Sequence, residues 1–235
     1  MKFLEHSSLL RVKAFLDHLD VGDYIVSGEL EAYSCKLAGL DKKLSKSLDT
    51  ELGSSPEMSK SPVGPLVESS SRKTLIYLIL TLNQIYPDYD FSQLRAHHFR
   101  KEPGLATAEE AIDSHLLEVS RKWESAPNRG EASFLDTLWK SLDEAVELPG
   151  CDVYTYKSDG DTDPFGEKGN IWAFNYFFYN KKQKKIAYFS CRAISRTVAH
   201  EDSKTSSGRY ASYASAADNS DDGDSRYGMA GAMDV

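Results

Sequence analysis

The stretch that decides the fold is Gly169–Ser195, which reads GNIWAFNYFFYNKKQKKIAYFSCRAIS. Two runs of aromatic and β-branched residues, Ile171–Tyr179 and Ile186–Ile194, flank the polar segment Asn180–Lys185. This pattern predicts two antiparallel strands joined by a basic turn. Side chains alternate between the two faces of a strand, and on the first strand both alternate sets are largely apolar. We therefore expect a central strand in a sheet that is covered on both sides.

The rest of the chain supplies further strands and helices that can cover such a sheet. Strands are predicted at Tyr24–Cys35, where Gly28 marks either a bulge or close packing, and at Cys151–Tyr156. Arg72–Tyr86 is apolar nearly all round, which is typical of a helix in the core. The other predicted helices cover Met1–Asp20, Ser92–Phe99, a segment opened by a capping box of Thr107 and Glu110, and Glu131–Glu147.

Composition and charge exclude several classes of protein. The 235 residues carry a formal net charge of −8, which argues against a surface made wholly for nucleic acid but leaves room for a local basic patch. The cysteines Cys35, Cys151 and Cys191 are widely spaced, and we expect buried thiols of an intracellular protein. No apolar run reaches the roughly 18 residues that span a bilayer, and the N-terminus lacks the apolar region of a signal peptide. We expect a soluble protein of the cytosol or nucleus.

Two segments are predicted to be disordered. Residues 37–71 hold nine serines between Ser45 and Ser71 and show no sustained apolar period. Ser45 follows two lysines, as basophilic kinases prefer, and Ser55 and Ser61 each precede a proline, as proline-directed kinases prefer. The segment is then either a phosphorylated regulatory insertion or an inert linker. From position 200 onward the chain has seven acidic and three basic residues, which predicts a disordered acidic tail.

Catalytic and metal motifs are absent from the sequence. Asp159, Asp161 and Asp163 imitate the start of a calcium loop, but Pro164 stands where the loop requires glycine. Four residues separate Cys191 from Arg196, which is one fewer than in the cysteine-to-arginine motif of thiol phosphatases. The sequence has no phosphate-binding P-loop, no Gly-x-Gly-x-x-Gly dinucleotide-binding motif and no Gly-x-Ser-x-Gly nucleophile elbow. We therefore expect that the protein is not an enzyme and binds no metal or cofactor.

The feature that does favour a specific function is the distribution of charge along the chain. Residues 168–196 contain seven basic residues and no acidic ones. Four lysines fall at the tip of the predicted hairpin: Lys181, Lys182, Lys184 and Lys185. This basic patch could bind nucleic acid, act as a nuclear-import signal, bind an acidic protein surface, or be a solvated turn with no binding function. Trp172 and Arg192 are further candidates for contact with a partner.

Three groups of motifs, in order along the chain, closely resemble the A, B and C boxes of the eukaryotic Maf-type repressors of RNA polymerase III. The A box is matched by Met1–Glu5 and Glu31–Lys36. The B box is matched by Tyr77–Asn83, Pro87–Ser92 and Arg100–Pro103. The C box is matched by Asp163–Glu167, Trp172–Lys182 and Phe189–Ser195.

The resemblance implies an α/β fold, with a central, mostly antiparallel sheet sandwiched by helices. It divides the chain into residues 1–36 (A box), a mobile linker at 37–71, residues 72–198 (B and C boxes of the same globular domain) and the tail at 199–235. It also implies a non-enzymatic repressor of transfer-RNA and 5S ribosomal RNA genes. Such a protein binds the clamp and initiation subunits of RNA polymerase III and blocks recruitment by the TFIIIB-type initiation factor.

The same resemblance implies regulation by phosphorylation. Nutrient-signalling and basophilic kinases would phosphorylate the linker and inactivate the repressor, a phosphatase would reverse this, and the protein would shuttle between nucleus and cytoplasm. The alternative, from the residues alone, is a regulator that binds DNA or RNA through the basic, aromatic hairpin. Neither hypothesis involves a membrane.

Overall fold

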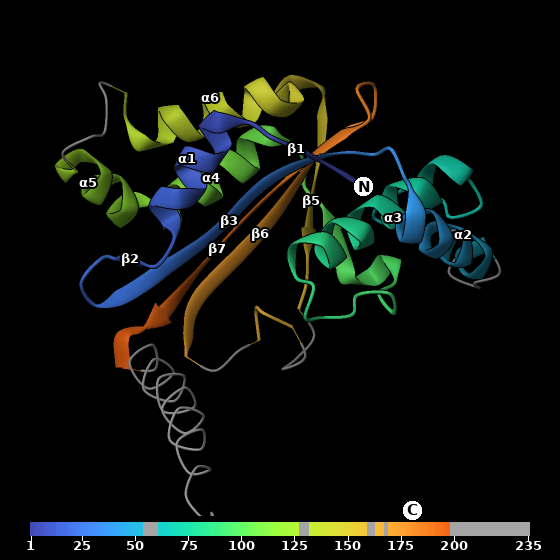
Figure 1. Ribbon diagram of the computed structural model, residues 1–235, viewed down its shortest axis with the longest axis horizontal. Helices are drawn as coiled ribbons and strands as arrows, with labels where there is room; N and C mark the ends of the chain where they lie inside the picture. The colour runs from blue at the N-terminus through green and yellow to red at the C-terminus, as the bar shows by residue number, and fades with distance from the viewer. Residues whose placement is uncertain (54–60, 127–131, 159–162, 167–168, 198–235) are drawn as a thin grey trace, which may run out of the picture. The chain divides into compact units, whose positions relative to one another are not determined.

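The structure is a computed structural model that describes residues 1–53, 61–126, 132–158, 163–166 and 169–197 (Figure 1). The chain divides into a body, Met1–Arg196, and a separate C-terminal unit, Thr197–Val235. Every element described below belongs to the body. The predicted acidic tail lies outside the described residues.

The body is built on one antiparallel sheet of seven strands among the described residues, in the order β1-β3-β7-β6-β5-β4, with β2 also paired to β3. The strands are β1 Lys2–Leu4, β2 Leu19–Asp20, β3 Tyr24–Ser34, β4 Phe99–Lys101, β5 Cys151–Tyr156, β6 Asn170–Asn180 and β7 Lys185–Ser195. The predicted hairpin is confirmed as β6 and β7. The family fold, a mostly antiparallel sheet between helices, is confirmed as well.

The central strand β7 is paired along its whole length with β3 and from Lys185 to Ile194 with β6. Against β3 the register runs from Tyr24 opposite Ser195 to Ser34 opposite Lys185. Against β6 it runs from Asn180 opposite Lys185 to Asn170 opposite Ile194, with one irregularity near Ile171. A strand from the N-terminal part of the chain is thereby joined to the hairpin near the end of the body.

Two layers of helices bury the two faces of the sheet, as the alternation on β6 requires (Figure 1). One layer consists of α1 Ser7–Leu16, α4 Leu105–His115, α5 Leu117–Ser125 and α6 Phe134–Val146; the other consists of α2 Gly39–Gly53 and α3 Ser69–Ile85. Phe174 and Phe178 of β6 point into the first layer, while Phe177 and Tyr179 point into the second. None of the helices in the described ranges has the length and apolar composition needed to cross a membrane.

The three cysteines are free thiols in this body, and the prediction that they are buried is confirmed for two of them. Cys35 and Cys191 are buried and Cys151 is half-buried. Burial raises the pKa of Cys35 and that of Cys151 to about 12. Burial raises the pKa of the Cys191 thiol well above its usual value.

The prediction of a mobile linker is wrong over residues 39–53, which form helix α2. Leu48 and Leu52 are each only 1% exposed and belong to the core under α3. Arg72 of α3 pairs with Asp49 at 2.7 Å and fixes the helix further. Beyond α2, Val63 and Leu66 are also buried, and residues 54–60 lie outside the described residues. Leucines four residues apart lie on one face of a helix, and their burial stabilises α2 although the segment is rich in serine.

Several predicted helix boundaries are also wrong. The first predicted helix is split into β1, α1 and β2, and in place of the helix predicted at Ser92–Phe99 only a 3₁₀ turn, Ala96–His98, precedes β4. The Asp90 side chain accepts a hydrogen bond from the backbone N–H of Ser92 at 2.9 Å, so it forms a local turn. Helix α4 begins at Leu105, before the proposed capping box, and α3 begins at Ser69, before its predicted start at Arg72.

Gly28 marks close packing and not a bulge, because β3 and β7 keep an unbroken register through it. A Cβ at this position would lie 2.8 Å from both Cβ and Cδ1 of Leu16, and 3.1 Å from the sulfur of Cys191. The absence of a side chain is what lets α1 lie against β3.

Replacing Gly28 with alanine should therefore lower the free energy of unfolding by about 1–3 kcal/mol, since α1 must shift to admit the methyl group. Urea denaturation followed by circular dichroism measures the change. Gly53→Ala is the matched control, because a Cβ there meets nothing within 4 Å. Equal stability of the Gly28→Ala protein and the parent would contradict this account of the α1–β3 contact.

Candidate functional site

The basic turn between β6 and β7 is fastened to the body by Asn180. This residue is 2% exposed, and its side-chain amide donates a hydrogen bond to the carbonyl of Val146 at 2.9 Å. Its side-chain oxygen accepts from the backbone N–H of Gln183 at 3.1 Å. Lys184 adopts a φ of 53°, and its carbonyl accepts from the N–H of Cys35 at 2.8 Å. The turn is thus a fixed feature of the surface.

The four lysines of the basic turn have different environments. The ammonium of Lys181 pairs with Asp152 at 2.8 Å, and that of Lys185 donates to the carbonyl of Ala145 at 3.1 Å. Lys182 and Lys184 are exposed. Within the described part of the chain, two of the four ammonium groups are engaged by the protein itself.

Asp152 is the acidic counterpart of the turn. Lys101 of β4 approaches it at 2.7 Å, from the opposite side of β5 to Lys181. Burial acts to raise the pKa of Asp152, but the hydrogen bonds from Lys101 and Lys181 outweigh it, so the pKa lies below its usual value. The carboxylate therefore stays charged and offsets part of the positive charge of the turn.

Trp172 and Arg192 lie at the other end of the hairpin. Trp172 is half-buried at the margin of the first core, and its ring is 5.3 Å from His115 and 6.0 Å from Tyr24. Arg192 is half-buried on the opposite face of the sheet and donates to the carbonyl of Pro164 at 3.3 Å. Eight strand residues separate Trp172 from the turn, or about 26 Å at 3.3 Å per residue. The predicted contact residues therefore do not form one site.

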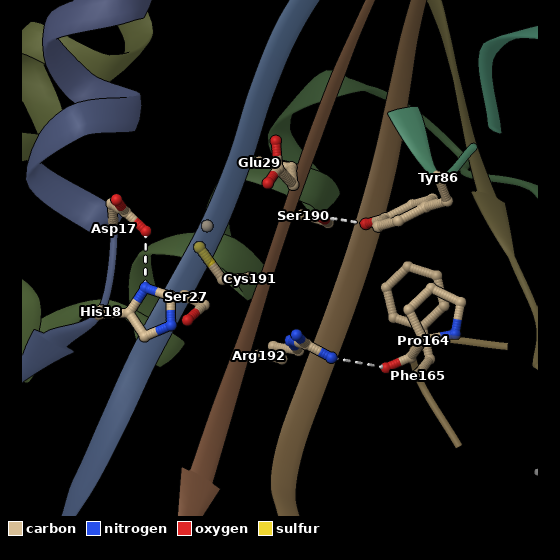
Figure 2. A pocket seen from close by; sticks show the side chains of 11 residues that line it. Asp17, His18, Ser27, Glu29, Tyr86, Pro164, Phe165, Ser190, Cys191 and Arg192 are labelled. Carbon is tan, nitrogen blue, oxygen red and sulfur yellow. Dashed lines mark hydrogen bonds and ion pairs between the residues drawn. The ribbon is translucent and has the colours of Figure 1, made fainter. Parts of the chain in front are cut away.

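Arg192 lines a small polar hollow on the α3 side of the sheet, beyond the end of that helix (Figure 2). The hollow has a volume of about 110 Å³, and its other lining residues come from the segment after α1 (Asp17 and His18), β3, β7, the end of α3 and the segment at 164–165. The Tyr86 hydroxyl lies 3.0 Å from that of Ser190 and 3.2 Å from that of Tyr188. Burial raises the pKa of Tyr86 to about 12, so this hydroxyl stays protonated and serves as a structural hydrogen-bonding group.

The groups around this hollow do not form a nucleophilic centre. Asp17 and His18 approach at 2.7 Å, and Ser27 lies nearby in Figure 2, but no hydrogen bond joins His18 to Ser27 in the described structure. A nucleophile needs such a bond to its base. The Cys191 thiol is buried with a raised pKa, so it is not a nucleophile at neutral pH. Among the described residues there is also no group of three or more His, Cys, Asp or Glu that could hold a metal ion.

The predicted phosphorylation sites lie in three different environments. Ser45 is half-buried within α2. Ser61 is half-buried in a turn, where its hydroxyl donates to the carbonyl of Gly64. Ser55 lies outside the described residues.

One charged cluster was not predicted from the sequence. Lys13 of α1 reaches around the edge of the sheet to Glu29 at 2.6 Å and Glu31 at 2.5 Å. The hydroxyl of Tyr33 also donates to Glu31. The alternation along β3 could have predicted that Ser27, Glu29 and Glu31 lie on one face of the strand. The contact with Lys13 could not be predicted, because it depends on how α1 packs against the sheet.

The comparisons with known proteins agree with this architecture. A sequence profile described as the Maf1 regulator matches residues 26–190. The chain belongs to the Maf1 regulator family. Among curated Maf1 relatives, "Repressor of RNA polymerase III transcription" from Dictyostelium discoideum is 36% identical, covering 83% of this chain and 86% of its own length. "Repressor of RNA polymerase III transcription maf1" from Schizosaccharomyces pombe is also 36% identical and covers 85% of both chains.

Solved Maf1 structures carry the same fold. A crystal structure of citrus MAF1 is 43% identical and superposes with a TM-score of 0.68, covering 80% of this chain and 99% of that one. A second crystal form of citrus MAF1 gives a TM-score of 0.67 over 81% of this chain. The resemblance found in the A, B and C boxes is confirmed.

The environment of Asp152 leads to a prediction about pH. The double substitution of Lys101 and Lys181 by glutamine should raise the pKa of Asp152, because both lowering contributions vanish while burial remains. The stability that the parent gains from Asp152 is present above about pH 4 and is lost as the pH falls through the lowered pKa. Loss of that stability on acidification should therefore be smaller in the variant. NMR titration of the Asp152 carboxyl carbon and acid unfolding measure the two effects.

Lys182→Gln is the matched control, since this lysine belongs to the same turn but is not among the groups that contact Asp152. A pKa of Asp152 that is the same in the double variant and in the parent would refute the role given to the two lysines.

Proposed function

We propose that this protein represses transcription by RNA polymerase III. The observation that carries the proposal is the match of the folded body to the Maf1 family, together with two relatives of 36% identity that are named repressors of this transcription. Repression proceeds by binding to the clamp and initiation subunits of the polymerase, which blocks recruitment by the TFIIIB-type initiation factor. No catalytic step is involved.

The fixed basic turn is a suitable polymerase contact. Lys182 and Lys184 are exposed at its tip, and the hydrogen bonds of Asn180 fix the backbone that carries them. A rigid, charged projection loses little conformational entropy on binding to an acidic protein surface. The same lysines serve as the nuclear-import signal when the protein moves from cytoplasm to nucleus.

Phosphorylation of Ser45 is the proposed inactivating switch. Residues four apart are neighbours on a helix, so Ser45 lies between Asp41 and Asp49. Asp41 pairs with the N-terminal ammonium group, and Asp49 pairs with Arg72, so both help to hold α2 on the body. A phosphate adds about −1.5 to −2 charges. It would repel both carboxylates and loosen α2.

Access to Ser45 requires local opening. The residue is half-buried in a helix, and kinases bind their substrates in an extended form, so α2 must first unfold locally. Basophilic and nutrient-signalling kinases would then phosphorylate Ser45 in the locally unfolded form. A phosphatase would remove the phosphate and allow α2 to refold. The Ser-Pro sites Ser55 and Ser61 are further proposed positions for proline-directed kinases.

Ser45→Asp should reduce repression of transfer-RNA synthesis several-fold, measured with purified RNA polymerase III on a transfer-RNA gene template. Ser45→Ala should repress like the parent. Ser47→Asp is the control, because Ser47 is exposed on the same helix. If Ser45→Asp and Ser45→Ala both repress like the parent, Ser45 is not the switch. Phosphatase treatment of protein from cells should raise the amount of RNA polymerase III that co-purifies with it.

The second candidate function is direct binding of nucleic acid by the basic turn, and the exposed Lys182 and Lys184 favour it. Against it, Lys181 and Lys185 are engaged by Asp152 and Ala145. A mobility-shift assay across a salt series separates the two functions. We expect weak binding with a shallow salt dependence, because two lysines can displace few counterions. Tight binding with a steep salt slope, abolished by replacing all four lysines with alanine, would favour nucleic acid as the target.

A further inference from the structure

The outer edge of β3 has a gap in its strand pairing. β1 pairs with Ala32–Ser34, and β2 pairs with Ile25 and Val26. Between them, Ser27–Glu31 have a strand partner only on the β7 side among the described residues. An edge of this kind presents backbone N–H and C=O groups that another extended chain can pair with.

A groove runs beside this gap. It lies between one side of α1 and the strand residues Gly28 and Glu29. Leu10, Lys13 and Ala14 of α1 line that side, and Asp17 lines it just after the helix. Its volume is about 550 Å³. Leu10 is 39% exposed, and Ala14 is also exposed, so the groove has an apolar wall. Gly28 contributes no side chain of its own.

The opposite face of the edge carries the polar hollow of Figure 2, to which Ser27, Glu29 and Ser190 contribute. Side chains of an added strand would alternate between these two spaces. One set would enter the groove beside α1, and the other would enter the hollow beside Glu29. Arg192 also lines the hollow, but its guanidinium donates to the Pro164 carbonyl.

The charge around the gap is predominantly negative. Asp17, Glu29 and Glu31 supply three carboxylates, and Lys13 bridges two of them. Glu29 keeps 37% of its side chain exposed, and Asp17 keeps 72%. The single ammonium group of Lys13 does not neutralise three carboxylates. Cationic side chains of a partner would therefore meet net negative charge here.

We propose that the edge Ser27–Glu31, which has no outer strand partner among the described residues and is crossed by the Lys13 side chain, is a docking site for an extended, basic segment of a partner protein, which displaces Lys13 and adds a short strand to β3. Five residues of strand span about 17 Å. A groove between a helix and an open strand edge is the geometry that PDZ and PTB domains use for strand addition. The segment alternates apolar residues, placed against Leu10 and Ala14, with lysine or arginine, placed against Glu29.

Charge excludes the other occupants. A second copy of this chain would bring the same carboxylates to the edge, and nucleic acid would bring phosphates. The proposal is independent of repression of RNA polymerase III.

The test uses the full chain and a fluorescent, acetylated nine-residue peptide of alternating valine and lysine, followed by anisotropy. We expect saturable binding, with slower amide hydrogen exchange at Ser27–Glu31. Glu29→Lys should weaken binding at least tenfold, and Glu29→Gln should weaken it about threefold. Glu124→Lys, which makes the same charge change at an exposed position of α5, should alter binding less than twofold. The same peptide N-methylated at alternate residues should bind at least tenfold more weakly, because main-chain hydrogen bonds are lost.

Three results would overturn the proposal. They are no binding at millimolar peptide, equal loss with Glu29→Lys and Glu124→Lys, and equal affinity for the N-methylated peptide. Circular dichroism of each variant verifies folding, and the unmodified protein with the two peptides decides the matter if Glu29→Lys fails to fold.

Discussion

The pairing of β7 with eleven-residue strands on both of its sides is the interaction on which the rest of the structure depends. It joins a strand from residues 24–34 to a hairpin that begins at residue 170, so the two ends of the body belong to one sheet. Because β6 is apolar on both faces in its turn-proximal half, the sheet requires two separate covers. The chain supplies them from different regions: α2 and α3 on one face, and α1 with α4–α6 on the other.

Covering both faces restricts where partners can reach the sheet. Among the described residues, the accessible places include a turn, part of one sheet edge and the part of one face beyond the end of α3. The basic turn, the gap beside β3 and the hollow at Tyr86 are these three places. They differ in charge: lysines dominate the first, and carboxylates dominate the second. One small body can thereby present surfaces of opposite sign to different partners.

The sequence predicted the parts of the fold that depend on local pattern. The hairpin, α3 and α6 follow from runs and periods that are visible in the residues. Helix α2 was missed because its buried Leu48 and Leu52 lie in a serine-rich stretch whose composition resembles disorder. At the site, the four lysines were found, but the engagement of Lys181 by Asp152 and of Lys185 by Ala145 was not. These contacts join residues about 30 to 40 positions apart, and only the tertiary fold brings them together.

The environment of the three cysteines has a consequence for their oxidation. Oxidants and electrophiles attack the thiolate, and raised pKa values leave Cys35, Cys151 and Cys191 almost entirely protonated at neutral pH. The first step towards sulfenic acid is therefore slow at all three positions. At its three thiols the folded body therefore reacts slowly with oxidants in its surroundings.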